Sequence, residues 1–196
     1  MNFRTYRHLI YADLYRIEGR RSIFSLLRQL IAGESFKYVF WHRTCQYTRS
    51  GRLAHYMAYP FCALFLRHYK YKLGISIPLS VKIGPGFFIG HFGGIVVNGA
   101  ASIGDNCNIS HGVTIGQANR GPRAGTPDVR DNVYIGPGAK IIGSVVVGSG
   151  SAIGANCVVV ADVPPRSVVV GIPGRVISSD LGSDGYINRI DYEKLL

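Results

Sequence analysis

Two histidines are the side chains of this sequence best suited to proton transfer. His91 lies in the segment GHFGG and His111 in SHGVT, whereas the other four histidines lie within residues 1–73. An imidazole gains and loses a proton near neutral pH, so it can act as a general base toward an attacking hydroxyl. The glycines that follow each histidine leave room for a substrate to approach the backbone. The sequence therefore predicts an acid–base site at one or both of these histidines.

Several other kinds of site lack the residues that they need. The four cysteines are far apart, and neither a Cys-x-x-Cys pair nor a Cys/His cluster occurs, so we expect no metal site. The sequence has no phosphate-binding loop and no dinucleotide-binding fingerprint, so kinase and dehydrogenase functions have no support. Unpaired cysteines fit a reducing compartment, and no signal peptide or bilayer-spanning apolar run is evident, so we expect a cytoplasmic protein.

An aliphatic residue recurs at every sixth position in the second part of the chain. A six-residue period indicates a parallel β-helix, in which six residues form one flat side and three sides complete a coil. Each coil buries its apolar residues only against its neighbours, so stability accumulates along the stack. Glycine or a small polar residue is expected at the corners, where the backbone needs a positive φ. The predicted inward residues are Ile83, Ile89, Val97, Ile103, Ile109, Ile115, Val129, Ile135, Ile141, Val147, Ile153 and Val159.

Charge and glycine content divide the chain near residue 74. Residues 1–73 hold 13 Lys and Arg, 3 Asp and Glu, and only 3 of the 25 glycines. Apolar residues recur there at helical spacing. We therefore expect a basic α-helical region at 1–74, a β-helix at 75–177 and a C-terminal tail at 178–196, so the fold class is mainly β.

The helical region is expected to hold four helices, the last at about 52–71 with a kink at Pro60. Its positive charge fits a solvated surface, or attraction to an anionic membrane or acidic polysaccharide intermediate. Nucleic-acid binding is disfavoured because no binding motif accompanies the charge. The residues that would suit an interfacial helix are Arg52, Leu53, Met57, Phe61, Leu64, Phe65, Arg67, Lys70 and Lys72.

A polar segment at 117–128, QANRGPRAGTPD, interrupts the six-residue period. Insertions in repeat proteins project as loops from one face, which is often the binding face. We expect Arg120 and Arg123, the two cations of this loop, to contact substrate.

The two repeat stretches resemble the left-handed β-helix of the hexapeptide-repeat acyltransferases. Within that family, IGHFGGIVVNGAASIGDNCNISHGVTIG and VRDNVYIGPGAKIIGSVVVGSGSAIGANCVVVADVPPRSVVVGIPGRVI are similar to serine O-acetyltransferases and to related sugar and capsular-polysaccharide O-acetyltransferases. The resemblance implies transfer of an acetyl group from acetyl-CoA to a hydroxyl, with no metal. Because GHFGG aligns with the segment that carries the catalytic base in serine acetyltransferases, the resemblance also implies that His91 is the general base, with His111 as an alternative base or a contributor. It also implies a homotrimer whose active sites lie between subunits and are closed by the 117–128 loop. A pair of trimers joined by the basic helical region is the alternative assembly.

Three departures from serine acetyltransferases bear on the acceptor. Ser76 replaces the aspartate that orients the base, and Gly90 replaces the aspartate beside the base. Gly125 stands where the loop arginine that holds the serine carboxylate is expected. The partner of the base could instead be a backbone carbonyl, Ser76 or Asp105, and these alternatives stay open. We expect Ser76 and Gly90 to line the acceptor site.

The resemblance also implies an acetyl-CoA groove in the later coils. Small residues there would let backbone amides meet the pantetheine arm, and arginines would pair with the phosphates. The expected contacts are Tyr134, Gly136, Gly154, Ala155, Arg166 and Arg175.

The sequence thus favours a cytoplasmic acetyl-CoA-dependent O-acetyltransferase acting on a sugar or a surface-polysaccharide precursor. The enzyme alternative is a serine O-acetyltransferase of cysteine biosynthesis, and the non-enzyme alternative is a β-helical scaffold or carbonic-anhydrase-like relative. A peripheral contact of the basic helices with the inner face of the membrane is a further expectation.

Overall fold

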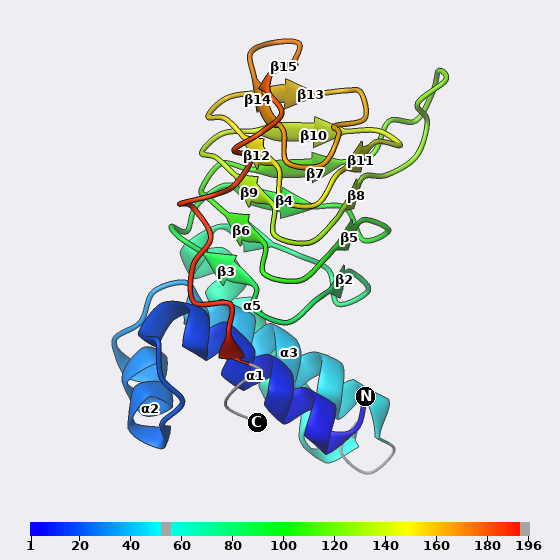
Figure 1. Ribbon diagram of the computed structural model, residues 1–196. Helices are drawn as coiled ribbons and strands as arrows, with labels where there is room; N and C mark the ends of the chain where they lie inside the picture. The colour runs from blue at the N-terminus through cyan, green and yellow to red at the C-terminus, as the bar shows by residue number, and fades with distance from the viewer. Residues whose placement is uncertain (52–55, 193–196) are drawn as a thin grey trace.

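The computed structural model describes residues 1–51 and 56–192. A layer of helices lies beneath a stack of short strands (Figure 1). The helices are α1 (Phe3–Glu18), α2 (Ile23–Ile31), α3 (Phe36–Ser50) and α5 (Tyr59–Leu73). Pro60 lies in the first turn of α5, where a missing backbone N–H costs nothing. Tyr56 and Met57 are also helical and Ala58 forms a turn, so the helical path is interrupted just before Pro60, close to the expected kink. The expected start of that helix at residue 52 lies outside the described residues.

The stacked strands form a left-handed parallel β-helix with three sheets, as the repeat and the family resemblance predict. Sheet A has the order β1-β4-β7-β10-β13, sheet B the order β11-β8-β5-β2 and sheet C the order β15-β14-β12-β9-β6-β3. Only β15 is antiparallel to its neighbour. The strands are β1 (Ile75–Ser76), β2 (Lys82–Ile83), β3 (Phe88–Ile89), β4 (Ile95–Val97), β5 (Ser102–Ile103), β6 (Asn108–Ile109), β7 (Thr114–Gly116), β8 (Asp128–Val129), β9 (Tyr134–Ile135), β10 (Lys140–Ile142), β11 (Val146–Val147), β12 (Ala152–Ile153), β13 (Val158–Val159), β14 (Val168–Val170) and β15 (Arg175–Ser178).

The predicted inward residues stack in columns. In sheet B, Ile83 pairs with Ile103 and Ile103 with Val129. Every predicted position is buried except Ile83, which is half-buried at the end of the stack that faces the helices. The six-residue period therefore predicted correctly which residues of neighbouring strands pair. It could do so because one aliphatic side chain per strand must point into a narrow interior.

Residues with a positive φ recur at the corners, as expected. Asn106, Asn132 and Asn156 have φ values of 56–57°, and glycines occupy equivalent turns. Asparagine tolerates this left-handed conformation better than most residues because its short side chain can hydrogen-bond locally.

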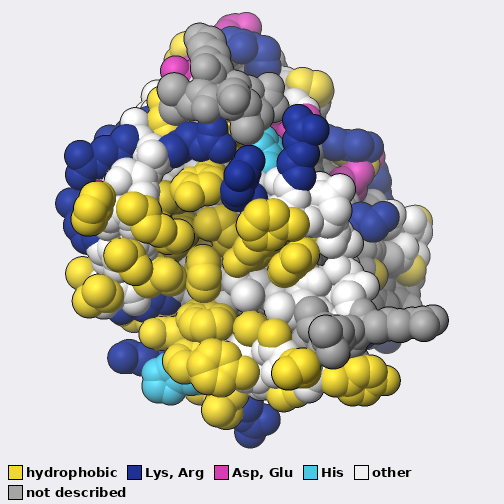
Figure 2. All heavy atoms as spheres, turned by 90° about the horizontal axis from the view of Figure 1, so that it is seen from below, with side chains coloured by type: hydrophobic (Ala, Val, Ile, Leu, Met, Phe, Trp, Pro, Cys, Tyr) yellow, Lys and Arg dark blue, Asp and Glu magenta, His cyan; other side chains and the backbone are white. Residues whose placement is uncertain are grey.

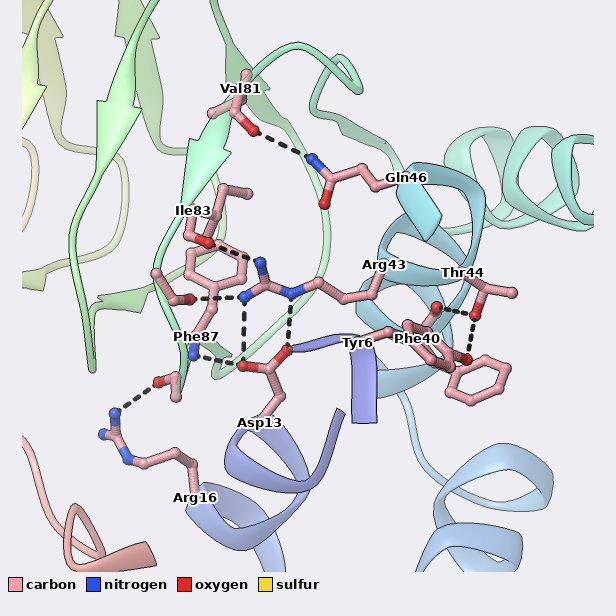
Figure 3. A network of polar contacts seen from close by, with 12 residues as sticks. Tyr6, Asp13, Arg16, Phe40, Arg43, Thr44, Gln46, Val81, Ile83 and Phe87 are labelled. Carbon is pink, nitrogen blue, oxygen red and sulfur yellow. Dashed lines mark hydrogen bonds and ion pairs between the residues drawn. The ribbon is translucent and has the colours of Figure 1, made fainter. Parts of the chain in front are cut away.

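A buried ion pair joins the helices to the first coil (Figure 3). Arg43 of α3 donates to the Asp13 carboxylate of α1, with 3.0 Å between Nε and Oδ2. Arg43 also donates to the carbonyl oxygens of Ile83 and Gly84 at 2.7 and 2.6 Å. Asp13 accepts the backbone N–H of Phe87 at 2.8 Å. The helical region is thus fixed to the β-helix by hydrogen bonds as well as by apolar packing.

The segment after β15 runs down sheet C to α1 (Figure 1). The ring of Tyr186 stacks on Tyr134, with 4.2 Å between centroids. Arg16 of α1 donates to the carbonyl oxygen of Asn188 at 2.8 Å and to Asn108 of β6 at 2.7 Å. This segment therefore covers the outer face of sheet C.

Candidate active site

His91 and His111 lie one above the other on a single edge of the β-helix. His91 is in the turn between β3 and β4, and His111 is in the turn between β6 and β7. Their ring centroids are 6.2 Å apart and the ring planes are inclined at 68°. Both side chains are exposed. We call the edge where the chain passes from sheet C to sheet A the histidine edge.

Glycines leave open space around His91. A Cβ atom added to Gly93 would meet no atom within 4 Å, and the φ of this residue is 110°. A Cβ added to Gly90 would meet only the Phe88 ring, at 3.6 Å. In the described part of the chain, the backbone amides of Gly93 and Gly94 donate no hydrogen bond. An acceptor can therefore reach the ring, and two amides remain for a developing negative charge.

Lys140 is a residue of this edge that the sequence analysis missed. It lies in β10 and its ammonium group donates to the carbonyl oxygen of Gly112, the residue after His111. The contact fixes the turn that carries His111 and brings a cation close to it. Lys140 pairs with Thr114 in the strand register and comes directly before the inward residue Ile141. This register was the feature of the sequence from which its position could have been predicted.

Asp105, one of the predicted partners of His91, lies on another edge of the β-helix. Within the described residues, the structure has no hydrogen bond to the His91 ring. Asp105 is in the turn between β5 and β6, where its side chain lies over Gly84. This turn belongs to the edge between sheets B and C, so Asp105 is not beside His91. Ser76 is half-buried on β1, paired with Val96 of sheet A.

The histidine edge continues upward as a row of small residues. Gly136 lies in the turn after β9, and Gly154 and Ala155 lie in the turn after β12. Gly136 is so close to the next coil that an added Cβ would lie 2.8 Å from the carbonyl oxygen of Ile153. Arg175 is exposed at the start of β15, beside the last turn of this row. These four predicted contacts therefore share one edge with the histidines.

Two other predicted acetyl-CoA contacts lie elsewhere. Arg166 is in the turn between sheets B and C, and its guanidinium donates to the carbonyl oxygen of Asp180 at 2.7 Å. The Tyr134 ring is on sheet C, beneath Tyr186. The C-terminal segment thus engages both side chains, which the repeat pattern gave no means to foresee.

The 117–128 loop projects from a different edge, between sheets A and B (Figure 1). Ala118 and Gly125 exchange two backbone hydrogen bonds across its base, at 3.0 and 2.9 Å. Arg123 forms an ion pair of 2.8 Å with Asp162, and Arg120 is exposed. The loop is thus held by its own subunit, but its arginines and the histidines lie on different edges.

No group of three or more His, Cys, Asp or Glu side chains among residues 1–51 and 56–192 could hold a metal ion.

Comparisons with known proteins agree with this architecture. The family model described as bacterial transferase hexapeptide (six repeats) matches residues 127–161. A serine acetyltransferase of Mycobacterium tuberculosis is 45% identical over 112 residues, which are 57% of this chain and 49% of the relative. One from Bacillus pumilus is 43% identical over 108 residues, which are 55% of this chain and 50% of the relative. The chain thus spans about half the length of these curated relatives.

Solved structures cover more of the chain. Serine acetyltransferase from Brucella abortus in complex with coenzyme A has a TM-score of 0.74 at 28% identity, covering 92% of this chain and 70% of that one. Soybean serine acetyltransferase complexed with serine has a TM-score of 0.72 at 30% identity, covering 89% of this chain and 70% of that one. The repeat, the three-sided coil and these likenesses together show that the chain belongs to the hexapeptide-repeat acyltransferases and resembles the serine acetyltransferases among them.

Proposed function

We propose that this chain transfers an acetyl group from acetyl-CoA to a hydroxyl at the histidine edge. The observation that carries the proposal is the pair His91 and His111, 6.2 Å apart on the edge that continues as the row of small residues. The likeness to a serine acetyltransferase crystallised with coenzyme A supports the co-substrate.

In the proposed reaction His91 is the general base. Its neutral imidazole takes the proton of the acceptor hydroxyl while the hydroxyl oxygen bonds to the thioester carbon. The resulting tetrahedral intermediate breaks its carbon–sulfur bond, and the imidazolium returns the proton to the departing sulfur. His111 lies close enough to act on the same substrate or to replace His91 as the base.

Backbone amides are the proposed oxyanion donors. The amides of Gly93 and Gly94 follow His91 directly and have no hydrogen-bond acceptor within the described chain. An amide donor aimed at the developing oxyanion contributes on the order of 10²–10³ in kcat in other acyl-transfer enzymes. The φ of 110° at Gly93 explains why a side chain is unsuited to this turn.

The comparisons favour L-serine over a sugar as the acceptor. The curated relatives described above are serine acetyltransferases, and the soybean enzyme was crystallised with serine. A serine O-acetyltransferase activity therefore replaces acetylation of a polysaccharide precursor as the leading candidate.

A neutral sugar hydroxyl stays the second candidate because Gly90 and Gly125 offer no charge to an amino acid. An amino acid brings an ammonium and a carboxylate, which need charged partners when they lose water. Gly90 beside the base has no side chain to supply a negative charge, and Gly125 supplies no positive one. Lys140 is a cation on this edge next to the turn of His111, and it is the proposed partner of the serine carboxylate.

The experiment that tests the function measures thiol release from acetyl-CoA by the full chain. L-Serine and a panel of neutral sugars are compared at equal concentration. A specificity constant for L-serine of about 10⁴ M⁻¹s⁻¹ or above is expected of an enzyme acting on its own substrate. Turnover with sugars alone would move the assignment to the second candidate. Thiol release that is the same in wild type and in a His91→Ala, His111→Ala protein would refute acetyl transfer at this edge.

A further inference from the structure

The face of the helical region that points away from the β-helix is largely apolar (Figure 2). On α2, Phe24 is 80% exposed and Ile31 is 77% exposed. Together with Leu27 they follow one stripe of the helix, at spacings of three and four residues. The opposite stripe of α2, with Leu26 and Leu30, packs into the cluster around Leu14 and Phe36. The exposed stripe therefore lies outside the apolar cluster that α2 helps to form.

A second exposed apolar stripe lies on α5. Phe61, Leu64 and Tyr71 are 60–68% exposed. Leu64 and Tyr71 also line a shallow hollow of about 550 Å³ together with Arg67, His68 and Lys72. The Arg67 guanidinium lies over the Tyr71 ring, 5.4 Å from its centroid. The hollow combines apolar walls with two cations, which suits a ligand with an anionic head and an apolar tail.

The charge of the helical region is almost entirely positive. Of the 3 acidic residues within positions 1–73, Asp13 is buried against Arg43 and Glu18 is held by Arg28 and Gln29. Most of the basic residues are exposed or half-buried, including Arg67, Lys70 and Lys72 of α5. The apolar stripes therefore lie within a cationic surface.

We propose that this face docks on an anionic lipid surface. Leu, Ile and Phe side chains would enter the boundary between headgroups and acyl chains, while Lys and Arg contact the phosphates. No helix in the described part of the chain is long and apolar enough to cross a membrane, so the contact lies in the plane of the interface. Of the residues expected to form it, Arg52 and Leu53 lie outside the described residues. The exposed ones are Met57, Phe61, Leu64, Arg67, Lys70 and Lys72. Phe65 is an exception, because it is half-buried with its ring stacked on Trp41 at 4.5 Å between centroids.

Charge argues against a second copy of the chain as the occupant. A two-fold contact brings each surface against its own equivalent, and here it would oppose two cationic surfaces at a cost in free energy. A lipid bilayer with anionic headgroups supplies the opposite charge and an apolar layer together. The partner proposed is therefore a membrane surface.

Vesicle sedimentation tests the proposal with the full chain. We expect binding to vesicles of phosphatidylcholine with phosphatidylglycerol, weakening as salt rises, and little binding to pure phosphatidylcholine. Phe24→Ser with Ile31→Ser is expected to weaken binding at least tenfold. Arg67→Gln with Lys70→Gln is expected to weaken it by roughly fivefold for each charge. Thiol release from acetyl-CoA with a water-soluble acceptor is expected to stay unchanged in the Phe24→Ser, Ile31→Ser protein, because neither residue belongs to the histidine edge. Lys70 is one turn before Gly74, which packs against Gly93 and Gly94, so the Arg67→Gln, Lys70→Gln protein is judged by vesicle binding alone.

Two matched control variants distinguish binding by this surface from non-specific binding of exposed apolar or basic side chains. Leu181→Ser removes an apolar side chain of 66% exposure from the C-terminal segment, and Arg130→Gln removes an exposed cation from the β-helix; neither is expected to change binding. Equal binding to neutral and anionic vesicles, or no binding to either, would overturn the proposal. So would sedimentation equilibrium in which Phe24→Ser, Ile31→Ser halves the mass of the particle, because the face would then join two copies.

Discussion

The two histidines of the histidine edge differ in their surroundings, which gives each a distinct expected role. His91 is followed by the open turn at Gly93 and Gly94, whereas His111 precedes Gly112, whose carbonyl accepts from Lys140. The open turn after His91 leaves space for an acceptor, which favours His91 as the base. The turn of His111 is held by Lys140, which favours a role for His111 in positioning the substrate.

His91→Ala is therefore expected to lower kcat by at least about 10²-fold with little change in acetyl-CoA affinity, because a lost base affects the transition state more than binding. His111→Ala is expected to be milder. Steady-state thiol release and a separate titration of coenzyme A measure the two quantities. The opposite order of the two effects on kcat would transfer the role of base to His111.

Gly90 offers a direct test of the acceptor. Its φ is not in the left-handed region and an added Cβ would meet only Phe88, at 3.6 Å, so an aspartate fits without strain. Gly90→Asp would place a carboxylate beside His91, where it can meet an ammonium group. We expect kcat/KM for L-serine to rise several-fold and that for a neutral hydroxyl acceptor to fall. Gly90→Asn serves as the control of equal size, and an equal gain with Asn would show that charge is not the cause.

At the scale of elements, the contacts of α1 and α3 with the first coil hold the helical region in place. Arg43 is almost fully buried and donates to Asp13, Ile83 and Gly84. Removal of one partner leaves a buried charge without compensation, which costs about 3–5 kcal/mol. We expect Arg43→Ala to lower the free energy of unfolding in urea by about that amount. Arg130→Ala, which breaks the exposed pair with Asp128, is expected to cost less than about 1 kcal/mol.

A second contact of α3 makes stability depend on pH. Nε2 of His42 lies 3.2 Å from the carbonyl oxygen of Pro78, so this nitrogen carries the proton of a neutral ring. Burial lowers the pKa of His42 to about 4. The unfolded chain takes up a proton near pH 6.5 and the folded one does not, so stability falls as the pH drops from about 6.5 to about 4.

The expected loss of stability over this interval is up to about 3 kcal/mol. Urea unfolding at pH 7, 5.5 and 4.5 measures it, with His42→Gln as the control that keeps a donor to Pro78 and does not titrate. If both proteins lose stability equally between pH 7 and 4.5, another group is responsible.

These elements also show where sequence reasoning succeeds and where it stops. The columns of Ile103, Ile109 and Ile115 follow from the six-residue period because a coil repeats the same environment. The approach of Arg43 to Ile83 and of Tyr186 to Tyr134 depends on how non-repeating segments pack on the stack, and no local pattern encodes that packing. Arg166 illustrates the consequence, since its αL turn directs it to the C-terminal segment and not to the histidine edge.

At the scale of the whole molecule, the residues predicted for the site lie on two edges. The histidines lie where sheet C meets sheet A, and the loop with Arg120 and Arg123 projects where sheet A meets sheet B. Within one chain, the histidine turns and the loop therefore lie at opposite margins of sheet A. Three copies around an axis parallel to the stack could place the loop of each beside the histidines of the next. We therefore expect a homotrimer whose sites are shared.

Mixed oligomers test whether each site uses two subunits. The first variant is His91→Ala, and the second replaces residues 119–124 by Asn-Gly, a two-residue turn that fits the hydrogen-bonded pair Ala118 and Gly125. Each variant alone is expected to be inactive, because each homotrimer lacks one half of every site. We assume that equal amounts of the two variants assemble at random in a closed ring. An intact site then needs His91 from the second variant and the loop from the first, and about a quarter of the sites meet this condition. Thiol release near a quarter of the wild-type rate supports shared sites. A mixture as inactive as its parents, in particles that light scattering shows to be trimers, would mean that each subunit completes its own site.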